Sequence, residues 1–191
     1  VPATYLSPLT PGRRLVGTAV TIRSIPVRIT PTQGHLDKEF IRMATRDLYY
    51  LAEAGDVAVA DFGGNLEVSN MGGQSCTVAR SRGLAGAIVN GAVRDVDAIR
   101  RLDYPVWCRG QTPISGKHRM EAIEINGPVT LHNVVVNPGD LVVADDSGVC
   151  IVPADRAESV LDRVSKLLAG ESRMRDLISS NAPIAEQKKI F

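Results

Sequence analysis

The chain has 191 residues, and its 22 basic and 21 acidic residues give a formal net charge of +1 at pH 7. A chain of this length suits a single domain that buries roughly 70% of its unfolded surface. No run of Lys or Arg exceeds two residues, and aromatic residues make up only 4% of the chain. These values argue against a nucleic-acid surface and a polybasic membrane patch, so we expect a small-molecule or protein partner.

The three cysteines indicate a reducing compartment. Cys76, Cys108 and Cys150 follow neither a disulfide framework nor a CxxC metal pattern, so we expect reduced, largely buried thiols. No apolar run approaches the roughly 18 residues that a membrane span needs. The first residues also lack the basic and then apolar pattern of a signal sequence. The sequence therefore predicts a cytoplasmic protein without a membrane partner.

Strand-like and helix-like patterns alternate after an irregular, proline-rich entry segment, residues 1–13. β-branched runs predict strands, and apolar residues at a 3.6-residue spacing predict helices. The expected elements, in chain order, are a strand over 15–22, a helix over 36–52, a strand over 57–60, a helix over 74–82, a strand over 84–90, a helix over 95–102 and a strand over 105–108. This alternation predicts βα units and an α/β fold.

The last third of the chain predicts further strands and one amphipathic helix. Residues 121–136, broken at Gly127-Pro128, predict a hairpin, and residues 149–152 predict the strand that closes the sheet. Asp155 and Glu158 resemble a capping box for a helix that ends at Gly170. Its apolar face comprises Ala157, Val160, Leu161, Val164, Leu167 and Leu168. We expect a single domain over residues 1–191, whose polar tail, residues 171–191, packs on a neighbouring subunit.

Two decapeptides, residues 55–64 and 139–148, are identical at six of their ten positions. Each predicts a turn, a short buried strand and an Asp that leads into a Gly loop. We infer two related structural units whose strand ends face each other. Asp61 and Asp145 end the two strands and are candidates for carboxylates near a site. The alternative is ordinary turn chemistry, in which Gly and Asp have no further function.

Two neighbouring motifs have the residue types of an anion and metal site. Gly72-Gly73 precedes a helix start whose free N–H groups suit a carboxylate or phosphate, although such a pair is often only a tight turn. Arg94 and Asp95 follow the predicted central strand, where open α/β sheets bind ligands. Arg94 can bind an anion, and Asp95 offers oxygen to Mg²⁺ or Mn²⁺. The alternative is an ion pair with Asp95 as an N-cap.

Other polar residues give weaker signals. Lys117 and Arg119 follow a loop rich in Gly and Pro and are placed to close over an anionic substrate, unless they belong to a solvated loop. The histidines lack the spacing of a metal site, and the chain has no phosphate-binding P-loop motif or Ser nucleophile motif.

The motifs together, spread over about residues 15–155, resemble one family, that of RraA (regulator of ribonuclease E activity A) and the 4-hydroxy-4-methyl-2-oxoglutarate aldolases. The residues that carry the resemblance are Gly55-Asp56 with Asp61, Gly72-Gly73, residues 89–95, Pro138-Gly139-Asp140 and residues 144–153. The resemblance implies an α/β/β/α swivelling-type fold with a central β-sheet core and peripheral helices. It also implies a homotrimer or hexamer with sites between subunits, and divalent-metal pyruvate aldolases that also decarboxylate oxaloacetate.

The resemblance also implies roles for individual residues. The N–H groups around Gly73, Gln74 and Ser75 would hold the carboxylate of a small 2-oxo acid. Arg94 would bind the substrate and the developing enolate, and Asp95 would anchor hydrated Mg²⁺ or Mn²⁺. Arg94 and Asp95 are thus the candidate catalytic residues. Lys117, from its place after the loop, is a further candidate for substrate binding.

One residue departs from the family pattern of a Gly, twenty residues, Arg-Asp, two residues and an acid. Ala98 stands where the acid is expected, and Asp97 lies one residue early, about 100° around a helix. The resemblance implies that family members lacking this acid share the fold but not the enzyme activity. The leading hypothesis is a metal-dependent lyase. The alternatives are a noncatalytic protein that regulates a ribonuclease or other partner by binding, and a different enzyme in which Lys117, Arg119 and Glu121 define the substrate.

Overall fold

The computed structural model describes residues 1–38 and 42–190, which form two compact units, Val1–Pro153 and Ala154–Phe191. The strands of the first unit are β1 (Ser7–Pro8), β2 (Leu15–Pro26), β3 (Val57–Asp61), β4 (Ser69–Met71), β5 (Gly86–Val93), β6 (Val106–Gln111), β7 (Met120–Ile125), β8 (Val129–Leu131), β9 (Val134–Val136), β10 (Leu141–Asp145) and β11 (Gly148–Val152). Its helices are α1 (Pro31–Leu36), α2 (Thr45–Leu51), α3 (Gly73–Ser81) and α4 (Val96–Leu102). The second unit contains a 3-10 turn, Ala154–Arg156, and the helices α5 (Ala157–Ser179) and α6 (Ile184–Gln187).

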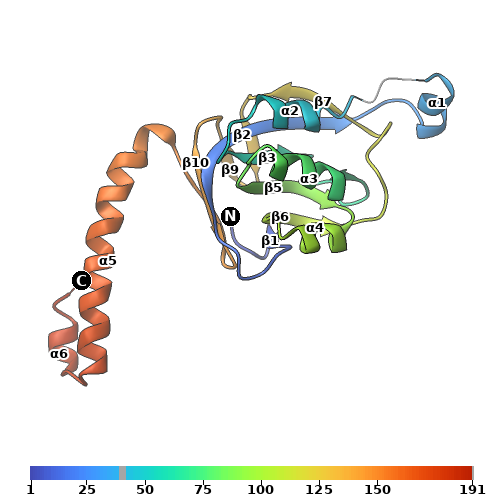
Figure 1. Ribbon diagram of the computed structural model, residues 1–191. Coiled ribbons are helices and arrows are strands. Elements are labelled where there is room, and N and C mark those ends of the chain that lie inside the picture. The colour runs from blue at the N-terminus through green and yellow to red at the C-terminus, as the bar shows by residue number, and fades with distance from the viewer. Residues whose placement is uncertain (39–41, 191) are drawn as a thin grey trace. The chain divides into compact units, whose positions relative to one another are not determined.

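A mixed sheet forms the centre of the first unit. Its strand order is β1-β6-β5-β3-β2-β10-β11, while β4 pairs with β5 and β7 pairs with β2. The pairs β2–β3, β3–β5 and β5–β6 are parallel, because α2, α3 and α4 lie between successive strands and return the chain to the same end of the sheet. Figure 1 shows these three helices on one side of the strands. The predicted α/β class, with a central sheet core and peripheral helices, is confirmed.

Both faces of the central strands are buried, in two apolar clusters. Successive side chains of a strand point to opposite faces, so Ala58 and Val89 join the cluster under the helices, whereas Val59 and Ile88 join the other. This second cluster packs against the small β8–β9 sheet through Leu131. Burial on both faces explains why β3 and β5 are continuous apolar runs.

The helix predicted over 36–52 is wrong. Only α2 lies within this range, because α1 already ends at Leu36, and Ala44 takes a left-handed conformation (φ 46°) at the N-cap of α2. Leu48 and Ala52 are buried as predicted, but Leu36 is 67% exposed. The apolar residues keep a helical spacing across the whole range, but this spacing does not reveal where the helix is interrupted. Phe40, which the helical spacing over 36–52 placed on the same apolar face, lies outside the described residues.

The hairpin predicted over 121–136 is also wrong. β7 pairs antiparallel with β2, with Ile125 beside Ile22, and the β8–β9 hairpin is a separate two-stranded sheet. Thr21 explains the change of partner, because its backbone C=O accepts from the N–H of Asn126 and its Oγ1 donates to the C=O of Gly127. These bonds hold Asn126 and Gly127 against β2, at the place where the prediction put the turn of the hairpin.

The two similar decapeptides form β3 and β10, which both pair with β2 but run in opposite directions. β3 is parallel to β2 and ends with Asp61 beside Arg23, whereas β10 is antiparallel and passes Leu15 just before Asp145. The prediction that the strand ends face each other is therefore wrong. Each Asp accepts a hydrogen bond from the N–H two residues later, of 2.9 Å for Asp61 and 2.8 Å for Asp145. This is the turn chemistry given as the alternative.

The second unit is dominated by one long helix. α5 continues through Gly170 to Ser179, and Arg156 rather than Asp155 is its N-cap, without a side-chain cap hydrogen bond. The predicted capping box and helix end are therefore wrong. Gly at a helix interior costs only about 1 kcal/mol, which does not by itself end a helix. None of the described helices is long and apolar enough to cross a membrane. Neither the packing of the tail on another subunit nor the single-domain organisation is tested, and both stay predictions.

Candidate active site

A cavity of about 470 Å³ lies beside the carboxyl end of β5 and the first turn of α3. Its lining comes from the start of α2, from β4, from the first turn of α3 and from the loop before β7. The lining residues are Met43, Ala44, Thr45, Arg46, Asp47, Asn70, Gln74, Ser75, Arg94, Ser115 and Lys117. We call it the Arg94 cavity. It unites Gln74, Ser75, Arg94 and Lys117, four of the residues predicted from the sequence to bind substrate.

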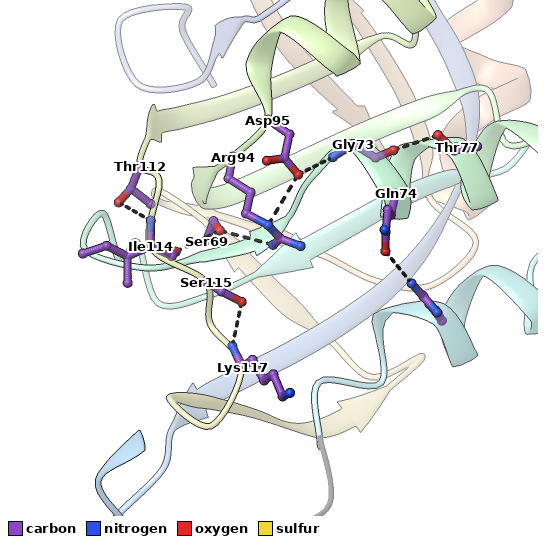
Figure 2. Close-up of polar contacts among 11 residues, drawn as sticks. Ser69, Gly73, Gln74, Thr77, Arg94, Asp95, Thr112, Ile114, Ser115 and Lys117 are labelled. Atoms are coloured by element: carbon purple, nitrogen blue, oxygen red, sulfur yellow. Dashed lines mark hydrogen bonds and ion pairs between the residues drawn. The ribbon is translucent and has the colours of Figure 1, made fainter. Parts of the chain in front are cut away.

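Arg94 is held at the end of β5 by both its backbone and its side chain. Its N–H donates to the C=O of Met71 at 2.9 Å, and Nη1 donates to Oγ of Ser69 at 3.4 Å. Nε lies 3.5 Å from Oδ2 of Asp95. Figure 2 shows the guanidinium between these two neighbours. A quarter of the Arg94 side chain is exposed, so it combines a fixed position with access to the cavity.

Asp95 caps the neighbouring helix. Its Oδ2 accepts a hydrogen bond of 3.1 Å from the backbone N–H of Gly73, at the first position of α3. Asp95 itself has a left-handed backbone (φ 57°), which turns the chain sharply from β5 into α4. Asp tolerates this conformation better than most residues. Asp95 is also the N-cap residue of α4, as the alternative proposed, but its side chain makes no cap hydrogen bond with that helix.

The two glycines before α3 allow the close approach of the Arg-Asp pair. A Cβ on Gly72 would lie 2.7 Å from Oδ2 of Asp95 and 2.8 Å from Cγ of Arg94. A Cβ on Gly73 would lie 2.8 Å from Cβ of Ala98. A side chain at Gly72 would displace Arg94 and Asp95, and one at Gly73 would force α3 and α4 apart, so these glycines are more than a tight turn.

The first turn of α3 supplies N–H groups for an anion. The N–H groups of residues N1 to N3 of a helix have no helical carbonyl to bond. Asp95 accepts from the N–H of Gly73, and the N–H of Cys76 donates to the backbone C=O of Gly72. The N–H groups of Gln74 and Ser75 and the positive end of the helix dipole therefore remain for a ligand.

Basic side chains surround the same cavity. Arg46 donates from Nη2 to Oε1 of Gln74 at 3.2 Å, and Lys117 is held through its backbone N–H, which donates to Oγ of Ser115 at 3.2 Å. Within the described part of the chain, Lys117 makes no ion pair. With Arg94, the cavity contains three cations and one acid, Asp47. This charge balance favours an anionic ligand.

Asp95 would be the main protein ligand of a metal ion, because few other suitable side chains of the described residues lie near it. Among residues 1–38 and 42–190, no three His, Cys, Asp or Glu residues are grouped closely enough to hold a metal ion. Asp97 is 85% exposed and lies 3.8 Å from Arg101, one turn away on α4. It therefore does not replace the missing acid at Ala98, whose Cβ faces Gly73 instead.

The thiol of Cys76 lies behind this site and is not a nucleophile. Burial, followed by the charge of Asp95, raises its pKa to about 12, although Arg94 acts in the opposite direction. Burial likewise raises the pKa of Cys108 to about 11. Both thiols are thus buried, as predicted, whereas Cys150 is exposed and departs from the prediction.

The residues of the third hypothesis do not line the Arg94 cavity, apart from Lys117. Arg119 donates from Nη1 to the C=O of Ser115, and Glu121 pairs with Arg42 at 3.5 Å. Glu121 lines a separate cavity of about 260 Å³, with His118 and Met120. A substrate defined jointly by Lys117, Arg119 and Glu121 is therefore not supported.

A family model described as RraA-like, Aldolase/RraA, matches residues 2–151. The chain belongs to the RraA-like family. A Halalkalibacterium halodurans protein named "Putative 4-hydroxy-4-methyl-2-oxoglutarate aldolase" is 34% identical over 139 residues, 73% of this chain and 66% of that protein. Protein DlpA of Legionella pneumophila is 30% identical over 186 residues, 97% of this chain and 29% of DlpA. The chain thus spans less than two thirds of the length of these relatives.

The fold agrees with solved RraA structures. The crystal structure of a Streptomyces coelicolor member of the RNase ES inhibitor RraA protein family superimposes with a TM-score of 0.78 at 27% identity. The superposition covers 91% of this chain and 82% of that one. Within this fold, the Arg94-Asp95 pair lies against the Gly72-Gly73 helix start, where Gly73 donates to Asp95.

Sequence reasoning missed part of this RraA-like site. Thr45, Arg46, Asn70 and Ser115 line the cavity but belong to none of the motifs that the sequence offered. Ser69-Asn70 directly precedes Met71-Gly72, so the polar pair before the glycine motif was the available signal for Asn70. Arg46 and Thr45 come from α2, whose start was hidden inside the helix predicted over 36–52.

Proposed function

We propose that this RraA-like protein is a divalent-metal-dependent lyase that cleaves a small 2-oxo acid through a pyruvate enolate. The reaction would be aldol cleavage of the 4-hydroxy-4-methyl-2-oxoglutarate type, decarboxylation of oxaloacetate, or both. The observation that carries the proposal is the position of the Arg94 guanidinium, which lines the same cavity as Gln74 and Ser75 of the first turn of α3. A relative with an aldolase name supports the same class of substrate.

Substrate binding uses the groups that the cavity leaves available. The N–H groups of Gln74 and Ser75 and the dipole of α3 hold the carboxylate next to the 2-oxo group. Gly73 contributes by its lack of a side chain and by donating to Asp95, which fixes the first turn. Lys117 and Arg46, which line the same cavity, bind a second acidic group. A dicarboxylic 2-oxo acid therefore matches the charges of the cavity.

Arg94 stabilises the negative charge that develops on the substrate during the reaction. Breaking the carbon–carbon bond, whether to an aldol fragment or to carbon dioxide, leaves an electron pair that moves onto the 2-oxo oxygen as an enolate. A guanidinium held by Ser69 and Asp95 needs no rearrangement to donate to that oxygen. Removing one such preorganised donor typically lowers kcat by about 10² to 10³.

The residues present fit a weakly held Mg²⁺ or Mn²⁺. Mg²⁺ is commonly bound by one or two carboxylates, with water and substrate oxygens completing its shell. Oδ2 of Asp95 is engaged by Gly73 and Arg94, whereas Oδ1 has no hydrogen bond within the described residues, and the side chain is 48% exposed. Asp95 would hold the metal, which when bound would polarise the 2-oxo group.

The test is pyruvate formation from 4-hydroxy-4-methyl-2-oxoglutarate and from oxaloacetate, followed as NADH oxidation by a coupled dehydrogenase with Mg²⁺ and with EDTA. We expect EDTA-sensitive turnover that falls at least about 10²-fold in Arg94→Lys, since Lys lacks the planar fork of donors. Arg101→Lys is the matched control, because Arg101 is 75% exposed and its ion pair among the described residues is with Asp97 on the same helix. Turnover that survives in Arg94→Lys, or none above the metal alone, would reject the proposal.

A second candidate function is a noncatalytic regulator that binds a ribonuclease or another protein. The observation that favours it is Ala98, which packs on Gly73 where the family's enzymes have an acid. The Streptomyces coelicolor relative belongs to a family of ribonuclease inhibitors by name. Inhibition of ribonuclease E cleavage at stoichiometric concentration, unchanged in Arg94→Lys, would support this function and separate it from the lyase.

We also propose that the protein assembles as a homotrimer or hexamer with sites between subunits. Support comes from α5, in which no residue is buried within its own unit and Leu161 is 59% exposed. A helix of this kind is stabilised mainly by packing of its apolar face. Light scattering coupled to gel filtration measures the assembly directly.

A further inference from the structure

Asn70 carries a buried carboxamide that no other group satisfies. The residue is 2% exposed, and neither Nδ2 nor Oδ1 has a hydrogen-bond partner within the described residues. Four other described residues, Thr10, Ser24, Tyr49 and Tyr104, also have an unpartnered buried hydroxyl, but only Asn70 lines the Arg94 cavity. Buried polar side chains nearly always have a partner in folded proteins, and an unpaired one is costly.

The surrounding backbone holds Asn70 at this place. The C=O of Ser69 accepts from the N–H of Gly116 at 2.7 Å, and the C=O of Met71 accepts from the N–H of Arg94 at 2.9 Å. The Asn70 backbone is thus fixed from both sides by segments that themselves line the cavity or border it. A Cβ on Gly116 would lie 2.7 Å from Oδ1 of Asn70. The absence of a side chain at Gly116 therefore leaves room for the carboxamide.

The neighbours of Asn70 include the group that would bind the reacting end of the substrate. Ser69, the preceding residue, accepts from Nη1 of Arg94, and Lys117, which follows Gly116 in the chain, also lines the cavity. In the proposed reaction Arg94 serves the 2-oxo oxygen, and Arg46 and Lys117 serve a carboxylate. The carboxamide serves a different kind of group, because it offers one acceptor oxygen and two donor hydrogens without charge.

We propose that Asn70 binds a hydroxyl group of the ligand and thereby selects hydroxylated dicarboxylic acids for the Arg94 cavity. A hydroxyl both donates and accepts, so it satisfies Oδ1 and Nδ2 together. A carboxylate only accepts and leaves Oδ1 facing negative charge. This inference rests on the proposed function and narrows it to 4-hydroxy-2-oxo acids, with oxaloacetate as the poorer substrate. Asn70 is a specificity residue and supplies neither base nor acid.

The test uses two stable ligands that differ only where Asn70 acts, 3-hydroxy-3-methylglutarate and 3,3-dimethylglutarate. Calorimetric titration of the wild-type protein is expected to show tighter binding of the hydroxylated acid by about 10- to 100-fold. Asn70→Leu, which has a similar volume without polar atoms, is expected to bind both acids equally. Asn133→Leu is the matched control, because Asn133 lies exposed in the β8–β9 turn.

The outcomes separate this inference from the proposed function. A hydroxyl preference that is lost in Asn70→Leu, in a protein that forms no pyruvate, supports Asn70 and rejects the lyase. Equal binding of the two acids by the wild-type protein, no binding of either, or a preference that survives in the variant overturns the inference. Asn70→Ala provides the same comparison if Leu prevents folding. Where pyruvate forms, both variants are expected to lose kcat/KM for the hydroxy acid more than for oxaloacetate.

Discussion

The Oδ2 atom of Asp95 accepts a hydrogen bond of 3.1 Å from the N–H of Gly73, which lies 22 residues earlier in the chain. Gly72, the N-cap of α3, has no side chain with which to cap its own helix. The cap comes instead from the end of the next strand. The same oxygen lies 3.5 Å from Nε of Arg94, so a single carboxylate joins the helix start to the guanidinium.

Asp95→Ala is expected to lower the free energy of unfolding by about 2 kcal/mol, from loss of the cap and from Ala in a left-handed conformation. Asp95→Asn is expected to cost less, because Asn tolerates that conformation and its amide oxygen still accepts. Urea denaturation measures both. Asp97→Ala, at an exposed position of α4, is the control and is expected to stay within about 0.5 kcal/mol of wild type.

Gly73→Ala is expected to destabilise the protein by about 1–3 kcal/mol, because its Cβ would lie 2.8 Å from Cβ of Ala98. Ala98→Gly removes that Cβ and is expected to cost about 1 kcal/mol through helix propensity. The double variant is therefore expected to lose less free energy of unfolding than the two single variants lose together. A double-mutant cycle measured by denaturation gives the coupling, and additive effects would contradict the contact.

The stability of the protein is expected to fall as pH rises above about 9, because burial raises the pKa of Cys76 from 9.0 to about 12. Between these values the unfolded chain loses the thiol proton while the folded chain keeps it. The unfolded state thus binds fewer protons, and the free energy of unfolding decreases with pH. Below about pH 9 the thiol is protonated in both states, so it causes no pH dependence of the free energy of unfolding there.

Thermal melts between pH 8 and pH 10.5 check this dependence. Cys76→Ala is expected to show a shallower decline than wild type, although burial also raises the pKa of Tyr49 and of Tyr104 and leaves part of the slope. Cys150→Ala, at an exposed cysteine, is expected to follow the wild-type slope. Equal slopes in all three proteins would contradict the assignment to Cys76.

The apolar face of α5 is expected to be needed for assembly. Leu161, Val164 and Leu168 recur at helical spacing and are 59%, 41% and 54% exposed within the described structure. Replacing the three by Gln is expected to reduce the molecular mass in light scattering from an oligomer to a smaller species. Replacing the polar residues Arg163 and Lys166 of the same helix by Gln is the control. An unchanged mass in the triple variant would contradict the prediction.

Local patterns were sufficient wherever one segment decides its own structure. The β-branched runs of β3 and β5 and the helical spacing of α3 and α4 predicted those elements, because each buries an apolar face whatever its partner. The Gly72-Gly73 and Arg94-Asp95 motifs were also recognisable, since close backbone approach and anion binding need those residue types at those places. The family resemblance followed from the same residues.

Tertiary structure decided the partners of these elements and the lining of the cavity. β7 leaves its predicted hairpin because Thr21 binds Asn126 and Gly127, and β10 pairs antiparallel with β2 whereas β3 pairs parallel with it. Such pairings depend on hydrogen bonds between segments far apart in sequence, which a local pattern does not encode. Asn70 joins the site for the same reason. Its place just before Gly72-Gly73 was a signal in the sequence, but only the fold brings Gly116 and the Arg94 cavity against its carboxamide.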